Sequence, residues 1–300
     1  MSTSIRNPES QPDHFTVRLI LTFFSLAAIL LSIFAWNTIG QSTQPGLEMV
    51  LININHGDSI LLRSTKGETA LIDAGYPDAG TLKYLNEHTV KHLDLLIVTH
   101  HDEDHIGGIP EVLRALEVDT YIENGQVIDT DYFHELDKTL QETGVRRKTV
   151  RTGDRIPFGE LTLEVWNPSR ARPDVVNNNS IVLFLQVGKV RFLLTGDIET
   201  PIEERLINSN RDLRVDILKV AHHAGNTSSS PAFLEAVKPK IAVYSASNNF
   251  PGFPNEDTID LLRIAGAKVY GTNFNGTITI NTDGKTYSIS TETGQPLLPY

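Results

Sequence analysis

Residues 99–108, with the sequence THHDEDHIGG, hold three histidines and three acidic residues. They follow the apolar run LDLLIV, which is typical of a buried strand. His100 and Asp102 are two positions apart, so their side chains can converge in an extended turn, and Asp104 and His105 come next, where a helix is expected to begin. Carboxylates crowded in this way repel one another unless a cation lies among them, and carboxylate and imidazole both bind zinc. The stretch therefore predicts a metal site at the end of a strand.

The alternative interpretation is a solvated acidic turn with incidental histidines. It is the weaker one, because five of the ten histidines in the chain fall in this stretch and in VAHHAGNTSSS, residues 220–230. His222 and His223 in the second stretch again follow an apolar run. Such a pair could supply one metal ligand and one substrate contact, or it could be structural.

Acidic residues end two further apolar runs. Asp197 lies in FLLTGDIE, residues 192–199, and Asp73 lies in TALIDAG, residues 69–75. An aspartate after glycine is usually a turn residue, but in a two-metal site it can be the carboxylate that both ions share. Because α/β folds place their sites at strand ends, the four stretches are expected to meet at one rim.

The composition limits the chemistry of such a site. The chain has 300 residues and no cysteine, so a metal would be held by His, Asp and Glu rather than by thiolates. The net charge of −11 gives no generally basic surface for nucleic acid, although a metal and a local basic patch could still hold a phosphate.

The amino-terminal part differs from the rest of the chain. Residues 1–18 are polar, residues 19–36 (LILTFFSLAAILLSIFAW) contain no charge, and residues 37–46 are typical of a linker. The uncharged run is just long enough to span a bilayer. We expect an uncleaved membrane anchor rather than a cleaved signal peptide, because no convincing small-residue cleavage pair follows. Residues 47–300 would then form a domain outside the cytoplasm, held at the cell membrane by one span or, in the alternative, secreted.

The elements that must position the site come in two batches. Strands are predicted at 47–54, 59–64, 69–75 and 93–100, and a second group at 161–168, 180–188 and 190–197, each group followed by helical patterns. This order predicts two sheets packed face to face with helices outside, a four-layer α/β arrangement.

These motifs together carry a family resemblance. HHDEDH resembles the HxHxDH signature of the metallo-β-lactamase superfamily, with Asp102 in place of the second histidine. With GDSILLRSTKGETALIDAG, NNNSIVLFLQVGKVRFLLTGDIE and LKVAHHAGNTSSSPAFL, the chain is similar over about residues 47–290 to the hydrolase domain of ComEC-type competence proteins. The resemblance implies the αββα fold and a hydrolase with two divalent metal ions. Zinc is the expected metal, and manganese is the alternative.

The resemblance also implies a ligand set. One metal would be held by His100 and Asp102 and the other by Asp104 and His105, with Asp197 bridging the two. One of His222 and His223 would complete the second site, and the other would face the substrate. Proton transfer would fall to Asp104 or to the free histidine, and the sequence leaves this choice open.

Further residues have roles only by resemblance or by position. Asp73 would orient the ligand turn, and Lys219 would neutralise a phosphate or pair with an acid. The asparagine-rich stretch would contact substrate or only form a turn; its candidates are Asn177, Asn178 and Ser180. His101 and Glu103 are expected to point away from the metals.

The function implied is a membrane-anchored phosphodiesterase or nuclease that uses a metal-bridged hydroxide and acts on a phosphodiester, with DNA as the candidate substrate. The alternatives are a hydrolase of a non-phosphate ester, lactone, thioester or lactam on the same fold, and a non-catalytic binding module. The sequence does not predict a particular protein partner. Many relatives carry a histidine where this chain has Phe253, in NFPGFP at 249–254, so specificity is expected to differ.

Overall fold

The computed structural model of the chain describes residues 45–172 and 174–294, together with Phe23 and Ala28. The chain divides into two units, residues 1–44 and 45–300, and all sheets belong to the second. The predicted tail, most of the predicted linker and, apart from Phe23 and Ala28, the predicted membrane segment at 19–36 lie outside the described residues. Within the described part, no helix has the length and apolar character needed to cross a membrane.

The first sheet has eight strands in the order β15-β14-β1-β2-β3-β4-β5-β6. It is antiparallel from β15 to β3 and parallel from β3 to β6. The bounds are β1 Leu47–Leu51, β2 Ile60–Ser64, β3 Thr69–Ile72, β4 His92–Ile97, β5 Glu117–Glu123, β6 Arg146–Thr149, β14 Ile278–Thr282 and β15 Tyr287–Thr291.

The second sheet has seven strands in the order β13-β12-β11-β10-β9-β8-β7. Strands β10 to β13 are parallel, and β7 to β10 are antiparallel. The bounds are β7 Arg155–Phe158, β8 Leu161–Asn167, β9 Val182–Val187, β10 Val190–Leu194, β11 Ile217–Lys219, β12 Ile241–Tyr244 and β13 Lys268–Gly271.

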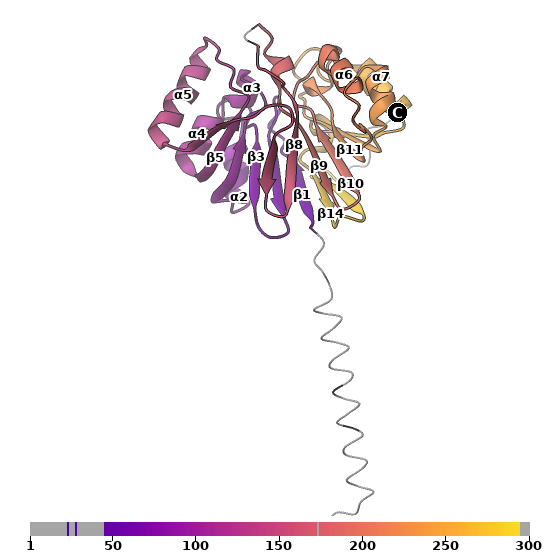
Figure 1. Cartoon of the computed structure of the whole chain (residues 1–300), viewed down its shortest axis with the longest axis horizontal. Helices are drawn as coiled ribbons and strands as arrows, with labels where there is room; N and C mark the ends of the chain where they lie inside the picture. Colours follow the sequence, from indigo (N-terminus) through magenta and orange to yellow (C-terminus); the bar gives the residue numbers. More distant parts are fainter. Residues whose placement is uncertain (1–22, 24–27, 29–44, 173, 295–300) are drawn as a thin grey trace, which may run out of the picture. The chain divides into compact units, whose positions relative to one another are not determined.

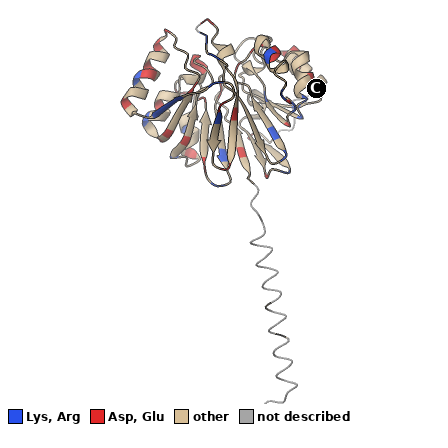
Figure 2. Ribbon diagram, viewed as in Figure 1, with Lys and Arg blue, Asp and Glu red and all other residues tan. Residues whose placement is uncertain are grey.

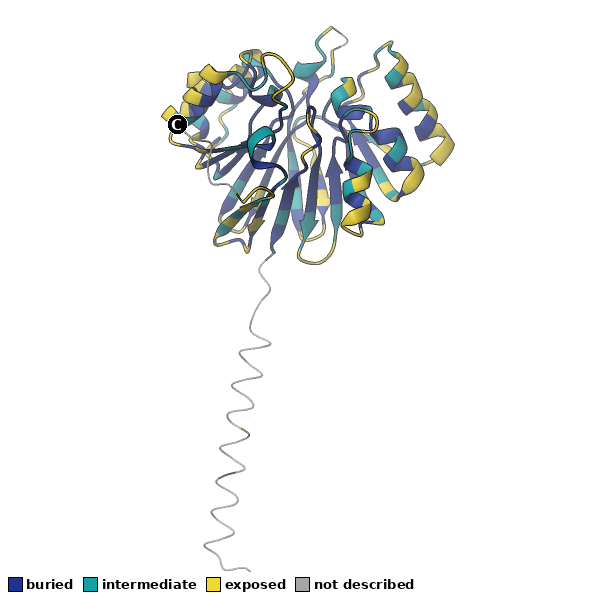
Figure 3. Ribbon diagram, turned by 180° about the vertical axis from the view of Figure 1, so that it is seen from behind, coloured by how far each residue is buried: buried dark blue, intermediate teal, exposed yellow. Residues whose placement is uncertain are grey.

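The helices cover the outer faces of the two sheets. Figures 1 and 3 show α2, α4 and α5 beside the first sheet and α6 and α7 beside the second. Lys, Arg, Asp and Glu of both signs are spread over the helices and the connecting loops (Figure 2). The bounds are α2 Thr81–Glu87, α3 Glu103–Ile106, α4 Ile109–Ala115, α5 Asp131–Thr143, α6 Thr200–Ile207, α7 Pro231–Val237, α8 Glu256–Ile264 and α9 Thr272–Asn275.

Successive strand residues divide between separate apolar layers, because neighbouring side chains of a strand point to opposite faces. On β2, Leu62 joins the core between the two sheets, with Leu163 and Leu183 of the other sheet. Its neighbour Leu61 belongs instead to an outer cluster that also includes Leu136 of α5. The second sheet has its own outer cluster with α6, α7 and α8. The predicted αββα fold is therefore confirmed, and burial on both faces explains the continuous apolar runs.

Candidate metal centre

The predicted ligands lie on three connections that meet at one edge of the two sheets. The connection after β4 carries His100 and Asp102, and the short helix α3 that follows it carries Asp104 and His105. The connections after β10 and β11 carry the rest of the predicted set. Strands β10 and β11 are parallel neighbours with Leu194 opposite Lys219, so the residues that follow them emerge side by side. The end of β4 faces them across the core because the two sheets pack together.

Backbone hydrogen bonds hold the ligand turn in place. The amide of Ala74 donates to His105 O at 2.9 Å, and the amide of Asp58 donates to Asp104 O at 3.2 Å. Gly57 has φ +95, and a Cβ there would lie 2.2 Å from Asp104 O. Only glycine allows the β1–β2 connection to approach the turn this closely.

The ligand atoms are spaced as neighbours around a shared cation would be. His223 Nε2 lies 3.0 Å from Asp197 Oδ2 and 3.2 Å from Asp104 Oδ2. His105 Nε2 lies 3.2 Å from the same Asp197 oxygen, and His100 Nε2 lies 3.4 Å from Asp102 Oδ2. Bonds of about 2.0–2.1 Å to a tetrahedral zinc would place adjacent ligand atoms about 3.4 Å apart. The donor set therefore fits divalent metal ions.

Buried polar atoms without partners support the same conclusion. His100 Nε2, His223 Nε2 and Asp197 Oδ1 are buried and have no hydrogen-bond partner. Such atoms are rare in folded proteins unless an ion or water satisfies them. His100, His105 and Asp197 form one group able to hold a metal ion, and Asp104 and His223 belong to a second.

The carboxylates impose a strong negative field on the two buried imidazoles. Burial alone would lower the pKa of His223, but the facing Asp197 and Asp104 raise it to about 10. The pKa of His105 is raised well above its ordinary value because Asp197, Asp104 and Asp73 outweigh burial. In turn, burial would raise the pKa of Asp197, yet His223 and His105 hold it well below its usual range. The site favours positive charge at its centre.

The two adjacent histidines differ in position. His223 is buried, with Nε2 toward Asp104 and Asp197 and Nδ1 3.1 Å from Ser245 O. His222 is less buried, with Nδ1 2.7 Å from Thr227 Oγ1. The geometry therefore favours His223 as the metal ligand, a choice that the sequence left open.

Asp73 lies behind the ligand turn. His105 Nδ1 and Thr99 Oγ1 donate to its Oδ2 at 2.8 and 2.6 Å, and the amide of Thr99 donates to its Oδ1 at 2.8 Å. These bonds direct His105 Nε2 toward Asp197, which is the orienting position expected from the sequence.

Lys219 is paired with an acid, one of the two roles predicted for it. Its Nζ lies 2.6 Å from Asp58 Oδ2, and both side chains are almost completely buried. The other oxygen of Asp58 lies 3.7 Å from His223 Nδ1. Asp58 therefore lies between the ammonium of Lys219 and the ligand histidine, and the negative carboxylate is the group that faces His223.

The asparagine-rich stretch is mainly a structural turn. The amide of Asp197 donates to Ser180 Oγ at 3.0 Å, and that hydroxyl lies 3.3 Å from His100 Nδ1. Asn178 exchanges two hydrogen bonds with Glu199. Asn177 is the member of the three that reaches the histidine pair, with Nδ2 3.4 Å from His222 Nε2.

His101 points away from the metal ligands, whereas Glu103 is exposed. The ring of His101 is fully buried, with Nε2 3.4 Å from Glu123 Oε2, and Arg147 Nε donates to the other Glu123 oxygen at 2.7 Å. His101 therefore belongs to a buried charged network behind the turn, which the sequence did not indicate.

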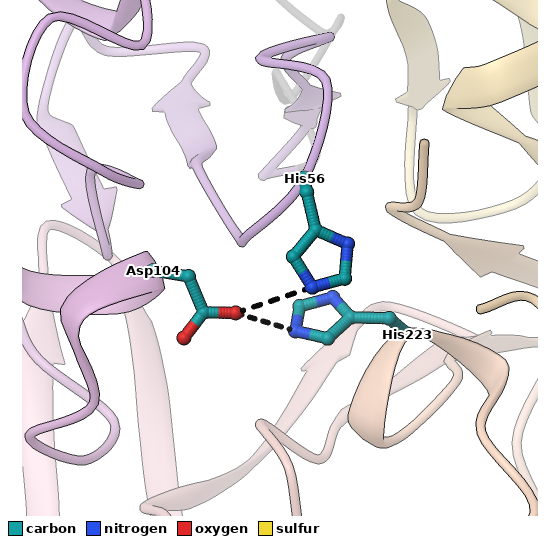
Figure 4. A group of neighbouring side chains, drawn as sticks. All are labelled: His56, Asp104 and His223. Carbon is teal, nitrogen blue, oxygen red and sulfur yellow. Dashed lines mark ion pairs between the residues drawn. The ribbon is translucent and has the colours of Figure 1, made fainter. Parts of the chain in front are cut away.

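His56 is a site residue that sequence reasoning missed. Its Nε2 lies 3.6 Å from Asp104 Oδ2, and its ring centroid lies 4.6 Å from that of His223 (Figure 4). Together with those two residues it forms a group able to hold a metal ion. Burial, with the neighbouring His223, lowers the pKa of His56 to about 4, so the ring is neutral near pH 7. The available signal was its place in HGD, between two predicted strands.

The fold and this site define a metal-binding αββα protein of the metallo-hydrolase type. The chain belongs to the metallo-beta-lactamase superfamily, whose family model matches residues 53–247. It is 30% identical over 255 residues to ComE operon protein 3 of Bacillus subtilis (strain 168), covering 77% of this chain and 32% of that protein.

A second competence protein is similar to the chain in sequence, and a solved structure is similar to it in fold. Competence protein ComA of Neisseria gonorrhoeae is 32% identical over 228 residues, 74% of this chain and 30% of that protein. A metallo hydrolase from the archaeon Ignicoccus hospitalis superposes with a TM-score of 0.54 at 18% identity, covering 77% of this chain and 98% of the other. The chain thus spans about a third of the length of the two curated relatives.

The assignment of the histidine pair can be tested by metal analysis. His223→Ala is expected to lose at least one bound metal ion per chain, because its imidazole faces both Asp104 and Asp197. His222→Ala should keep the metal content of the unsubstituted protein, as should His134→Ala on the surface. The measurement is inductively coupled plasma mass spectrometry after dialysis. Metal loss in His222→Ala but not in His223→Ala would reverse the assignment.

The buried ion pair can be tested by unfolding in the presence of a chelator. Lys219→Met is expected to lower the free energy of unfolding by about 3–5 kcal/mol, because Asp58 would remain buried without its partner. Lys240→Met is the matched control: Lys240 pairs with Asp216 but is largely exposed, so its loss should cost less than about 1 kcal/mol. The double variant Lys219→Met/Asp58→Asn should recover part of the loss. Equal stability of Lys219→Met and the unsubstituted protein would contradict this role.

Proposed function

We propose that the αββα domain is a metal-dependent phosphodiesterase or nuclease, with DNA as the candidate substrate and zinc or manganese as the metal. The observation that carries the proposal is the convergence of three carboxylates and three imidazoles at one sheet edge: His100, Asp102, Asp104, His105, Asp197 and His223. A carboxylate-rich donor set suits hard cations that bind phosphate oxygens. Similarity to a competence protein supports a nucleic acid as the substrate.

Divalent cations held there would stabilise charge on a phosphoryl oxygen and make water nucleophilic near neutral pH. Other residues of the chain would hold the metal ligands in position. Asp73 fixes the ring of His105, and Ser180 holds the backbone of Asp197. Both contacts are buried, so the ligands keep their positions before substrate arrives.

His222 and Asn177 would contact the substrate, and His222 would accept a proton. In the tautomer that donates from Nδ1 to Thr227 Oγ1, His222 Nε2 has a lone pair beside Asn177 Nδ2. Burial lowers the pKa of His222, so the imidazole is neutral and able to accept a proton near pH 7. Asp104 is the less suitable base, because burial would raise its pKa but His105 and His223 hold that pKa below its ordinary value.

The activity can be tested with a substrate panel on metal-loaded protein. We expect hydrolysis of bis-p-nitrophenyl phosphate, and little or no hydrolysis of a lactone or of nitrocefin. Asp197→Asn should reduce phosphodiester hydrolysis at least about 100-fold, since loss even of an outer partner of a metal ligand costs 10- to 100-fold.

Glu103→Gln is the matched control, because Glu103 is an exposed carboxylate in the same turn. It should retain full activity. Hydrolysis of the lactone or nitrocefin without phosphodiester hydrolysis would favour the non-phosphate alternative. Absence of bound metal from the purified protein would favour a binding module.

The proposal includes a location. Residues 19–36 would anchor the chain in the cell membrane by one span and hold the domain outside the cytoplasm, because the run has no charge and bilayer-spanning length. The full-length chain should stay in the membrane fraction after an alkaline wash. Leu26→Arg/Leu30→Arg should release it, since arginine at the centre of a span costs about 2.5–3.5 kcal/mol per residue. Release of the unsubstituted chain, or an N-terminus cut after residue 36, would contradict the anchor.

A further inference from the structure

We propose that the aromatic side chains of Phe250 and Phe253 form a stacking subsite for a nucleobase next to the metal centre. The inference rests on the proposed function and names the part of the substrate that sets specificity. Phe250 and Phe253 lie on the connection between β12 and α8.

The aromatic rings lie directly against the histidines of the site. The Phe250 ring stacks on the ring of His56 with centroids 3.8 Å apart and an angle of 10° between the planes. Phe253 meets His56 edge-on at 5.6 Å and lies 5.1 Å from His222. Tyr76, from the connection after β3, stacks on His56 from 6.4 Å. An aromatic surface thus borders the groups expected to hold the metal and the phosphate.

Phe250 is placed to receive a further ring. It is 41% exposed, and only Val127 and Ile264 join it as exposed large apolar side chains among the described residues 45–172 and 174–294. One face of the ring is covered by His56, so the exposed area belongs largely to the other face and the edges. Aromatic side chains exposed beside a phosphate-binding site are the usual platform for unpaired bases, and stacking works with any base because each has a π-face.

The loop that carries these rings is tied to the site. The amide of Asn255 donates to Ala224 O at 2.9 Å, next to the ligand histidine His223. A Cβ on Gly225 would lie 2.5 Å from Phe253 Cε1, so glycine there allows the ring to lie against the histidine turn. The amide of Phe253 donates to Phe250 O at 3.2 Å, which holds the two rings on one short loop.

A nucleobase fits this surface better than an alkyl group. The rings are flat and grouped on one side of the metal ligands, and a base lies one sugar away from its phosphate. With the phosphate at the metals, the adjacent base would reach the exposed face of Phe250. An alkyl chain would gain burial from such a surface but no stacking.

Binding can be measured without turnover. Isothermal titration of the metal-loaded full chain with thymidine 5′-monophosphate, 1,2-dideoxyribose 5-phosphate and butyl phosphate compares a base, no base and an alkyl chain on the same phosphate. We expect the thymidine compound to bind at least about tenfold more tightly than either of the others. Phe250→Ala should abolish most of that difference and leave binding of 1,2-dideoxyribose 5-phosphate unchanged, whereas Phe250→Trp should keep it.

Ile264→Ala is the matched control, because Ile264 is an exposed apolar residue at the end of α8, and it should change nothing. Equal binding of the three ligands, or butyl phosphate binding as tightly as the thymidine compound, would overturn the subsite. So would an equal loss of all three ligands in Phe250→Ala, because that would mean a role only in supporting His56. Base-dependent binding without phosphodiester hydrolysis would reject the proposed function and keep the subsite.

Discussion

The buried contacts of Asp104 and Asp197 with His105 and His223 are the interaction on which this structure depends. Carboxylates are rarely buried unless they are paired or bind a metal. Here the buried Asp197 and the partly buried Asp104 face the same imidazole at 3.0 and 3.2 Å. Their field raises the pKa of both histidines. In addition, His100 Nε2, His223 Nε2 and Asp197 Oδ1 are buried without a hydrogen-bond partner. The site is thus strongly favourable to cations and costly without one.

The rest of the domain supports this concentration of charge. Strands β10 and β11 pair in parallel, and β4 packs against their sheet through the core between the sheets, so that the connections after the three strands meet. Behind the ligands, Lys219 balances Asp58, and Arg147 balances Glu123 beside His101. Each buried acid in these networks has a basic partner, which is the condition under which buried charge is tolerated. The metal centre is therefore one end of a larger buried electrostatic network.

The sequence predicted the fold well because its signals are local or ordered along the chain. Continuous apolar runs ending in acids and histidines indicated strands buried on both faces with a site at their ends, and two batches of strands indicated two sheets. The sequence did not predict which strands pair when they are far apart along the chain. Strand β14 lies beside β1, with Ile278 opposite Leu51, although most of the chain separates them. No local pattern specifies such a partner, because apolar strands can pair in many orders.

Residue identity and spacing were enough to indicate the class of protein and to predict histidine and aspartate as the metal ligands, because they limit which donors can converge after a strand. Which donors face each other follows from the folded structure. It turned His223 inward and His222 toward Thr227, brought His56 against Asp104 through a close approach at Gly57, and stacked Phe250 on His56. Adjacent residues in a turn can point in either direction, and contacts between distant loops follow from how the sheets pack. The directions of these side chains and their contacts therefore depend on the packing of the folded core and not on the local motif.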